Sequence, residues 1–215
     1  MLPFGLAAAA PCRQAGRMPR LLIFALLAAS LASPANAQPA AEWRREATEA
    51  DRDRIREIRR SWIAALDSAR AAGHGPAIIG EGVLLDPDGA HGLTPPPPGD
   101  YVCRTIKLGT QTDIIAYANY PATRCRIGQD GERLTFVKLD GSQRPTGRFY
   151  PDNDRRMVFL GTMQLGDEQR AYQYGIDPDR DMIGALEMIG PNRWRLALPA
   201  PAHESLLDVI ELTPR

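Results

Sequence analysis

Long hydrogen-bonding side chains concentrate in one short stretch, GSQRPTGRFYP at residues 141–151. Glycines and prolines alternate with Gln143, Arg144, Arg148 and Tyr150, which predicts a rigid loop that holds these side chains in place. Guanidinium, amide and phenol groups together can receive a carboxylate, a phosphate or a sugar. We therefore take these four residues as candidate ligand-binding residues.

The two arginines of this stretch also have a purely structural interpretation. Arg144 and Arg148 would pair with acids such as Asp152 or Asp154 and fix a corner of the fold. In the functional interpretation the loop borders the mouth of a ligand pocket. The sequence leaves both interpretations open. In the functional one the side chains point toward a common pocket, and in the structural one they do not.

Three carboxylates suggest a second kind of chemistry. Glu187, Glu204 and Asp208 would supply the acid and base of an enzyme acting on envelope polymers if two of them lay about 5 to 10 Å apart in one cleft. The sequence has no G-x-S-x-G, H-E-x-x-H or G-x-x-x-x-G-K motif, and no G-x-G-x-x-G after a predicted strand. We therefore predict no catalytic residue and no cofactor.

The residues that commonly bind metals form no recognisable set. The three histidines are scattered along the chain. Asp177, Asp179 and Asp181 alternate, but the glycine and the terminal glutamate of a calcium-binding loop are missing, so a tight turn is the better interpretation. The sequence predicts no metal site.

Residues 1–37 have the layout of a secretory signal peptide. Three arginines precede the apolar run LLIFALLAASL at 21–31, and the small residues ANA at 35–37 form a cleavage pattern. The apolar run is shorter than the ~20 residues that a membrane span needs. We expect cleavage near Ala37, a periplasmic or secreted mature chain, and no transmembrane span in it.

The mature chain keeps two cysteines, because Cys12 leaves with the signal peptide. In an oxidising compartment, Cys103 and Cys125 without a C-x-x-C spacing predict a structural disulfide, which would stabilise the fold by about 3 kcal/mol. Removing the three arginines of the signal leaves 23 basic and 26 acidic residues. This slightly acidic balance does not predict a basic surface that would bind nucleic acid.

The first part of the mature chain predicts helices. From Trp43 to Ala72, apolar residues such as Ile55, Trp62 and Leu66 recur every three or four positions, and the remaining surface carries charges of both signs, as a solvated helix face does. A second, shorter helix is predicted from Pro76 to about Leu85. Its expected buried side consists of Ile78, Ile79, Val83 and Leu84. The following segment, with four prolines at 95–98, is predicted to be an extended connector.

The rest of the chain predicts an antiparallel β structure. The clearest alternation has Trp194, Leu196 and Leu198 facing in while Arg193, Arg195 and Ala197 face water. Eight short strands separated by turn residues favour an eight-stranded up-and-down barrel with a lipocalin-like layout, and a β-sandwich is the runner-up. The expected strands are 100–108, 117 or 123 to 127, 133–139, 147–150, 156–165, 181–189, 193–198 and 206–212.

Several strings resemble the exported bacterial family called domain of unknown function 4893. The most distinctive are GSQRPTGRFYPD at 141–152 and IGPNRWRLALP at 189–199, and further similarity lies in CRTIKLG at 103–109, FLGTMQLGDE at 159–168 and ESLLDVIEL at 204–212. The resemblance implies export and a shared fold. It brings no activity, cofactor or catalytic residue.

We therefore expect a signal peptide at 1–37, a helical extension with a proline-rich connector at 38–98, and a barrel domain at 99–215. The function favoured is that of a non-enzymatic periplasmic protein that binds a small ligand or an envelope protein. One alternative is an inhibitor-like barrel that blocks an envelope hydrolase, another is the carboxylate-dependent enzyme, and a third is a structural component whose helix docks a partner.

Overall fold

The computed structural model describes residues 42–112 and 115–215. The predicted signal peptide lies outside the described residues. Contacts group the described residues into one compact unit.

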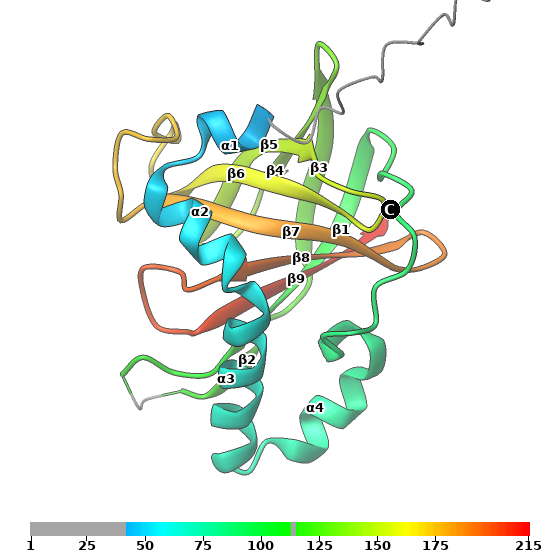
Figure 1. Ribbon diagram of the computed structural model, residues 1–215, viewed down its shortest axis with the longest axis vertical. Helices are drawn as coiled ribbons and strands as arrows, with labels where there is room; N and C mark the ends of the chain where they lie inside the picture. The colour runs from blue at the N-terminus through cyan, green and yellow to red at the C-terminus, as the bar shows by residue number, and fades with distance from the viewer. Residues whose placement is uncertain (1–41, 113–114) are drawn as a thin grey trace, which may run out of the picture. The chain divides into compact units, whose positions relative to one another are not determined.

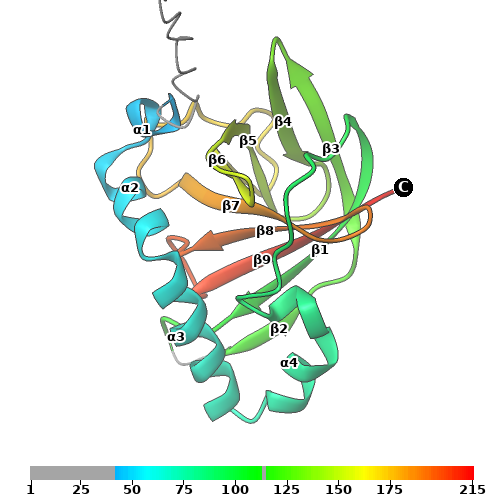
Figure 2. The same ribbon diagram turned by 45° about the vertical axis from the view of Figure 1, so that its right-hand side comes forward.

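The β-strands form a closed antiparallel barrel (Figures 1 and 2). Each strand from β3 onward pairs with the next along the chain, and the last strand, β9, pairs back onto β1 from Leu108 opposite Leu207 to Tyr101 opposite Pro214. The short β2 adds to the edge of β1, so the barrel itself has eight strands. The predicted eight-stranded up-and-down barrel is confirmed. The strands are β1 (Gly99–Leu108), β2 (Tyr117–Asn119), β3 (Thr123–Asp130), β4 (Arg133–Lys138), β5 (Gln143–Pro151), β6 (Arg156–Leu165), β7 (Asp181–Gly190), β8 (Arg193–Pro199) and β9 (Leu207–Pro214).

One half of the barrel interior is filled by aromatic and aliphatic side chains. On β6, Met157 and Phe159 point inward while Val158 points outward. Phe136, Phe149 and Phe159 pack together with ring centroids 5.6 to 6.1 Å apart. Cys103 on β1 and Cys125 on β3 lie in the same interior and form the predicted disulfide, with their Cα atoms 5.9 Å apart.

The helical segment is divided where the sequence predicted one long helix. The elements are α1 (Glu42–Glu46), α2 (Glu49–Arg56), α3 (Ile58–Ala71), α4 (Gly75–Glu81) and a 3-10 turn, η2 (Gly82–Leu85). Thr48 adopts an extended backbone and its hydroxyl accepts a hydrogen bond from the Asp51 amide at 3.2 Å, so α2 begins afresh there. In the second helix Ile78 and Leu84 are buried as predicted, but Ile79 is 81% exposed.

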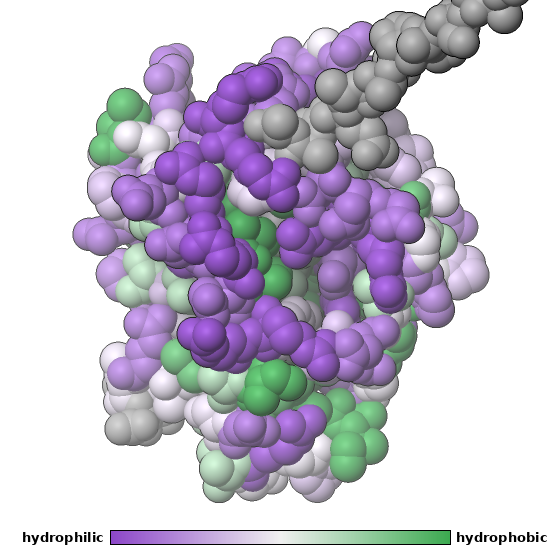
Figure 3. All heavy atoms as spheres, in the orientation of Figure 1, coloured by the Kyte–Doolittle hydropathy of each residue, from purple (hydrophilic) through white to green (hydrophobic). Residues whose placement is uncertain are grey.

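The helices cover the outer face of the barrel. Trp62 and Leu66 of α3 pack against Ile106 on β1 and Val209 on β9, and α1 and α2 lie over β5 to β7. The outward surface of the helices is charged, with exposed ion pairs such as Arg56 with Asp53. Figure 3 shows this hydrophilic surface and a hollow with hydrophobic residues at its base. Most charged residues of α2 and α3 therefore form a solvated face, as the sequence predicted, but Asp51 of α2 is fully buried.

This cover corrects one expectation for β8. Arg195 and Ala197 point out of the barrel as predicted, but both are fully buried rather than facing water. Arg195 donates a hydrogen bond to Glu187 on β7 at 2.8 Å and lies over the Trp62 ring at 4.8 Å. Its guanidinium also donates to the main-chain carbonyls of Val83, Leu84 and Asp86. The residue thus joins the barrel wall to η2.

The proline-rich connector closes one end of the barrel. The Trp194 indole donates to the Thr94 carbonyl and the Tyr101 hydroxyl donates to the Pro97 carbonyl, both at 2.7 Å. Leu93 packs against the interior side chains at the same end. Tyr101 lies near the start of β1, so the end of β1 reaches the opposite opening of the barrel.

Candidate functional site

A cavity of about 340 Å³ occupies the barrel end opposite the connector. Leu198 on β8, Met163 on β6 and Ile210 on β9 form its apolar side. Thr105 on β1 also lines it, and its hydroxyl oxygen is inaccessible to solvent and has no hydrogen-bond partner among the described residues. The cavity thus offers an apolar surface, and the Thr105 hydroxyl oxygen lies buried behind it.

Charged residues from two paired strands form one polar side of the cavity. Lys107 on β1 lies directly opposite Asp208 on β9 in the antiparallel register, and both line the cavity. The Lys107 ammonium lies 3.4 Å from an Asp208 oxygen and 2.9 Å from an oxygen of Glu204, which precedes β9. Ser205 donates a further hydrogen bond to Asp208 at 2.5 Å.

The environments of the two acids shift their pKa values in opposite directions. Asp208 is almost fully buried, and this burial raises the pKa of its carboxyl. Glu204 is largely exposed, and the hydrogen bond from Lys107 lowers its pKa. Burial disfavours the charge of Lys107, but the two carboxylates outweigh it, so the Lys107 pKa is raised. Lys107 is therefore an ammonium held between two acids.

Lys138 on β4 forms the other polar side. Its amine nitrogen donates to the main-chain carbonyls of Asp140 at 2.8 Å and Gln143 at 3.1 Å, and the residue is only 8% exposed. Burial lowers the pKa of the Lys138 ammonium. The Asp140 carboxylate is instead bound by Arg124, whose two hydrogen bonds and main-chain amide hold the Asp140 pKa down at about 2.

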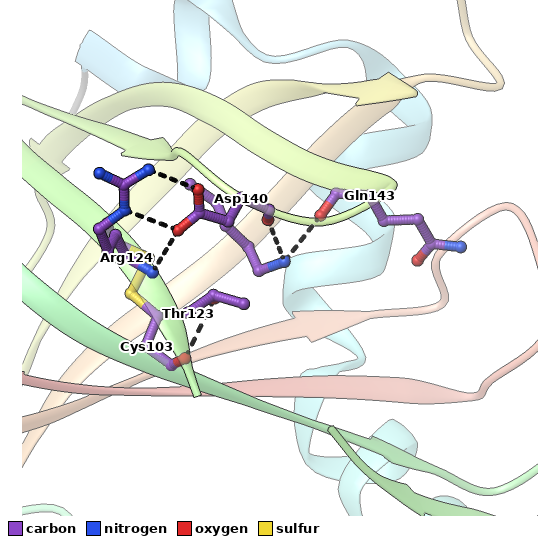
Figure 4. The surroundings of a disulfide bond; sticks show 7 residues. Cys103, Thr123, Arg124, Asp140 and Gln143 are labelled. Carbon is purple, nitrogen blue, oxygen red and sulfur yellow. Dashed lines mark hydrogen bonds and ion pairs between the residues drawn. A yellow bond between two sulfur atoms is a disulfide. The ribbon is translucent and has the colours of Figure 1, made fainter. Parts of the chain in front are cut away.

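Neither Arg124 nor Asp140 lines the cavity, and Figure 4 shows the pair beside the disulfide. Arg124 reaches Asp140 beside the disulfide of Cys103, whereas the side chain of Gln143 points away from the pair. The disulfide joins β1 to β3 next to Thr123, which also lines the cavity. The cross-link therefore supports the wall of the candidate site.

A family model described as domain of unknown function (DUF4893) matches residues 43–212. The chain belongs to this family. The match extends from Trp43 on α1 to Leu212 on β9 and so includes the whole lining of the cavity. The comparison with curated proteins and the comparison with solved structures returned no match.

Of the four candidate ligand-binding residues in this DUF4893 chain, only Gln143 lines the cavity. The strand predicted at 147–150 is confirmed, but β5 begins already at Gln143, inside the predicted loop. Alternate residues of a strand face opposite sides, so Gln143 points inward while Arg144, Arg148 and Tyr150 point outward. Thr146 is the first residue of β5 that pairs with β4. Pro145 precedes it and therefore needs no main-chain hydrogen bond to β4, so a proline is tolerated there.

The three outward residues are each held by neighbours. Arg144 donates to main-chain carbonyls of the β4–β5 and β6–β7 loops, at Gly141, Gly166 and Glu168. Arg148 pairs with Asp130 at 2.9 Å rather than with Asp152 or Asp154. Tyr150 is buried and donates to Glu46 of α1 at 2.5 Å. Arg148 and Tyr150 both line an open hollow on the outer face of β4 to β6, but Arg144 does not, so the structure brings only two of the three side chains together.

The sequence reasoning missed Lys107 and Lys138. A signal for both was present, because each lysine is in phase with inward-facing residues of its strand: Lys107 follows Cys103 and Thr105 at even spacing, and Lys138 follows Phe136. A lysine in the inward phase of a closed barrel is costly to bury, which marks it as a candidate functional residue.

The three carboxylates considered for catalysis divide between two places. Glu204 and Asp208 meet at the cavity, whereas Glu187 lies on the outer face with Arg195. Among the described residues, no group of three or more potential ligands is arranged to hold a metal ion. No helix in the described part of the chain is long and apolar enough to cross a membrane.

Proposed function

We propose that this protein is exported to the periplasm and there binds a small amphiphilic molecule in the barrel cavity. The observation that carries the proposal is the cavity itself, which has an apolar side at Leu198, Met163 and Ile210 and a polar side at Lys107 and Lys138. Its volume of about 340 Å³ falls within the range of small-ligand pockets. A ligand with one apolar and one polar end matches this division.

The closed far end of the barrel supports the binding of a ligand that enters from one side. The connector closes the other end, so an apolar chain can enter only from the lysine side. Gln143, retained from the sequence prediction, contributes an amide at the same rim.

Calorimetric titration with decanol, decanoate and decyltrimethylammonium tests the proposal. At least one of these probes is expected to bind, and Thr105→Phe, which fills the cavity, is expected to weaken that binding at least about tenfold. Val102→Phe is the matched control, because Val102 lies on the same strand but points outward and is 37% exposed. Equal loss in both variants, or no binding of any probe, would refute the proposal.

Export has a separate test. The observations that support it are the signal pattern of residues 1–37 and the disulfide, which persists in oxidising compartments. Expression of the full chain in a Gram-negative host is expected to yield periplasmic protein whose first residue is Gln38. An uncleaved chain that stays in the cytoplasm with reduced cysteines would contradict it.

A carboxylate-dependent hydrolase is the second candidate. In its support, the pKa of Glu204 is lowered and that of Asp208 is raised in the same cavity. Acid–base catalysts use two carboxyl groups whose pKa values differ in this way. It ranks second because Lys107 lies between the two carboxylates, where a reacting group would have to sit. Release of soluble fragments from purified peptidoglycan, abolished by Glu204→Gln, would favour it, and the absence of any release would remove it.

A further inference from the structure

The chain contains only two lysines, and both line the cavity. Lys107 and Lys138 are the only lysines among the 26 basic residues of the sequence, and all the others are arginines. Arginine serves an ordinary cationic contact at least as well, because its planar guanidinium forms two parallel hydrogen bonds. A lysine differs in that it can release its proton when buried and become a nucleophile. The distribution therefore indicates that the cavity uses the amine and not merely a positive charge.

The two lysines are held in different ways. Lys107 is bound by the carboxylates of Glu204 and Asp208, which stabilise its charged form. Lys138 has main-chain carbonyls as its acceptors, and no described carboxylate lies within ion-pair distance of it. A neutral amine that donates both of its hydrogens to these two carbonyls directs its lone pair away from them. Lys138 is therefore the residue whose surroundings suit a nucleophile.

We propose that Lys138 captures a small aldehyde or ketone in the cavity as an imine. The neutral amine nitrogen attacks the carbonyl carbon to give a carbinolamine, which loses the oxygen as water when the C=N bond forms. The two hydrogens of the amine leave with that oxygen, so no oxidant or reductant is needed. Asp208 and Glu204 line the same cavity and can carry these protons.

The apolar side of the cavity selects the rest of the ligand. Leu198, Met163 and Ile210 would pack against an alkyl or aryl group attached to the carbonyl carbon. The inference rests on the proposed ligand-binding function and names its ligand class. It also explains why position 138 holds a lysine and not an arginine.

Reductive trapping tests the capture directly. The full mature protein is incubated with hexanal and sodium cyanoborohydride at pH 7, and the modified residues are located by peptide mass mapping. Lys138 is expected to be alkylated at least about tenfold faster than an ordinary lysine, because burial favours its neutral form. The trapping rate should rise with pH and level off below the ordinary lysine pKa of about 10.4.

An internal reference comes from Arg60→Lys. Arg60 lies on α3, away from the cavity, with a side chain 79% exposed, so this substitution introduces an unactivated surface lysine into an intact protein. The N-terminal amine and Lys107 are scored in the same digest. Lys138→Arg keeps the charge and should abolish trapping at that position, with near-ultraviolet circular dichroism checking the fold.

The outcomes separate the inference from the function on which it rests. Preferential trapping at Lys138, lost when the protein is unfolded in urea, supports it. Equal labelling of Lys138 and the introduced surface lysine overturns the imine, and if decanol still binds, the proposed binding function survives. Failure of all probes to bind removes both.

Discussion

At the scale of single residues, the cavity concentrates charges that a barrel interior would normally exclude. Burying Lys107 and Asp208 costs free energy that their mutual attraction rarely repays in full. Their positions follow from the register, because paired residues of β1 and β9 share a face of the sheet. Since nothing in the folding of an eight-stranded barrel requires an ion pair there, its presence is consistent with the proposed binding function.

The raised pKa of Asp208 predicts a pH-dependent contribution to stability. Between the ordinary aspartate pKa of about 3.8 and the raised folded value, the folded protein binds more protons at this site than the unfolded chain does. The free energy of unfolding of the wild type, relative to Asp208→Asn, should therefore be largest near pH 4 and fall as pH rises through the folded pKa. Urea unfolding of both proteins at pH 4 and pH 8 measures the difference, and an increase toward pH 8 would contradict the assignment.

At the scale of elements, alternation along a strand was the part of the fold that the sequence could predict. It placed Trp194 inside and Arg195 outside correctly. It did not predict that α3 and η2 cover Arg195, because alternation distinguishes the two faces of a strand without showing what packs on each. The prolines and glycines of residues 141–151 indicated a loop around the strand predicted at 147–150. The structure extends that strand back to Gln143, which is possible because Pro145 needs no hydrogen bond to β4.

The candidate site was only partly predictable for a related reason. Gln143 was found because it lies among other polar residues, whereas each cavity lysine is isolated within an apolar strand. A single lysine in an alternating strand usually marks a solvent-facing position. Only the closure of β9 onto β1 brings Lys107 to Asp208, and that long-range pairing is not visible in either segment alone.

The pairing of two glycines controls how β5 and β6 approach each other. Gly147 lies opposite Gly161, and a Cβ at Gly147 would lie 2.2 Å from the Leu160 carbonyl oxygen and 2.5 Å from the Gly161 Cα. These are main-chain atoms that cannot move aside cheaply, so Gly147→Ala should reduce the free energy of unfolding by about 1 to 3 kcal/mol. The residue also lies between the aromatic half of the interior at Phe149 and the cavity at Pro145.

Gly80 on α4 provides the matched control for this substitution. A Cβ there would have no neighbour within 4 Å, so Gly80→Ala should leave stability unchanged or raise it by up to about 1 kcal/mol. Denaturant unfolding compares the two variants. Similar stability in both would show that β5 and β6 can separate freely, contrary to the close packing described.

At the scale of the whole molecule, the helices and the barrel form one folding unit. The outer faces of β1 and β9 carry Ile106, Leu108, Leu207 and Val209, all fully buried beneath the helical segment. An antiparallel barrel that stood alone in water would have polar residues at these positions. The charged outer surface of α2 and α3 thus faces the solvent in place of these strands.

A fragment that contains only residues 99–215 should therefore fail to form a stable soluble barrel. Removing the helices would expose a contiguous apolar surface at Ile106, Leu108, Leu207 and Val209 and leave the Arg195 guanidinium without its carbonyl partners in η2. The milder change Trp62→Ala, which leaves a cavity under α3, should cost about 3 to 5 kcal/mol. Dye binding and near-ultraviolet circular dichroism of the fragment, with urea unfolding of the variant, measure these effects. A soluble, native-like fragment would show that the helical segment is dispensable for folding and free to dock a partner, as in the structural-component alternative. An unfolded or aggregated fragment would show that the helical segment is part of the core.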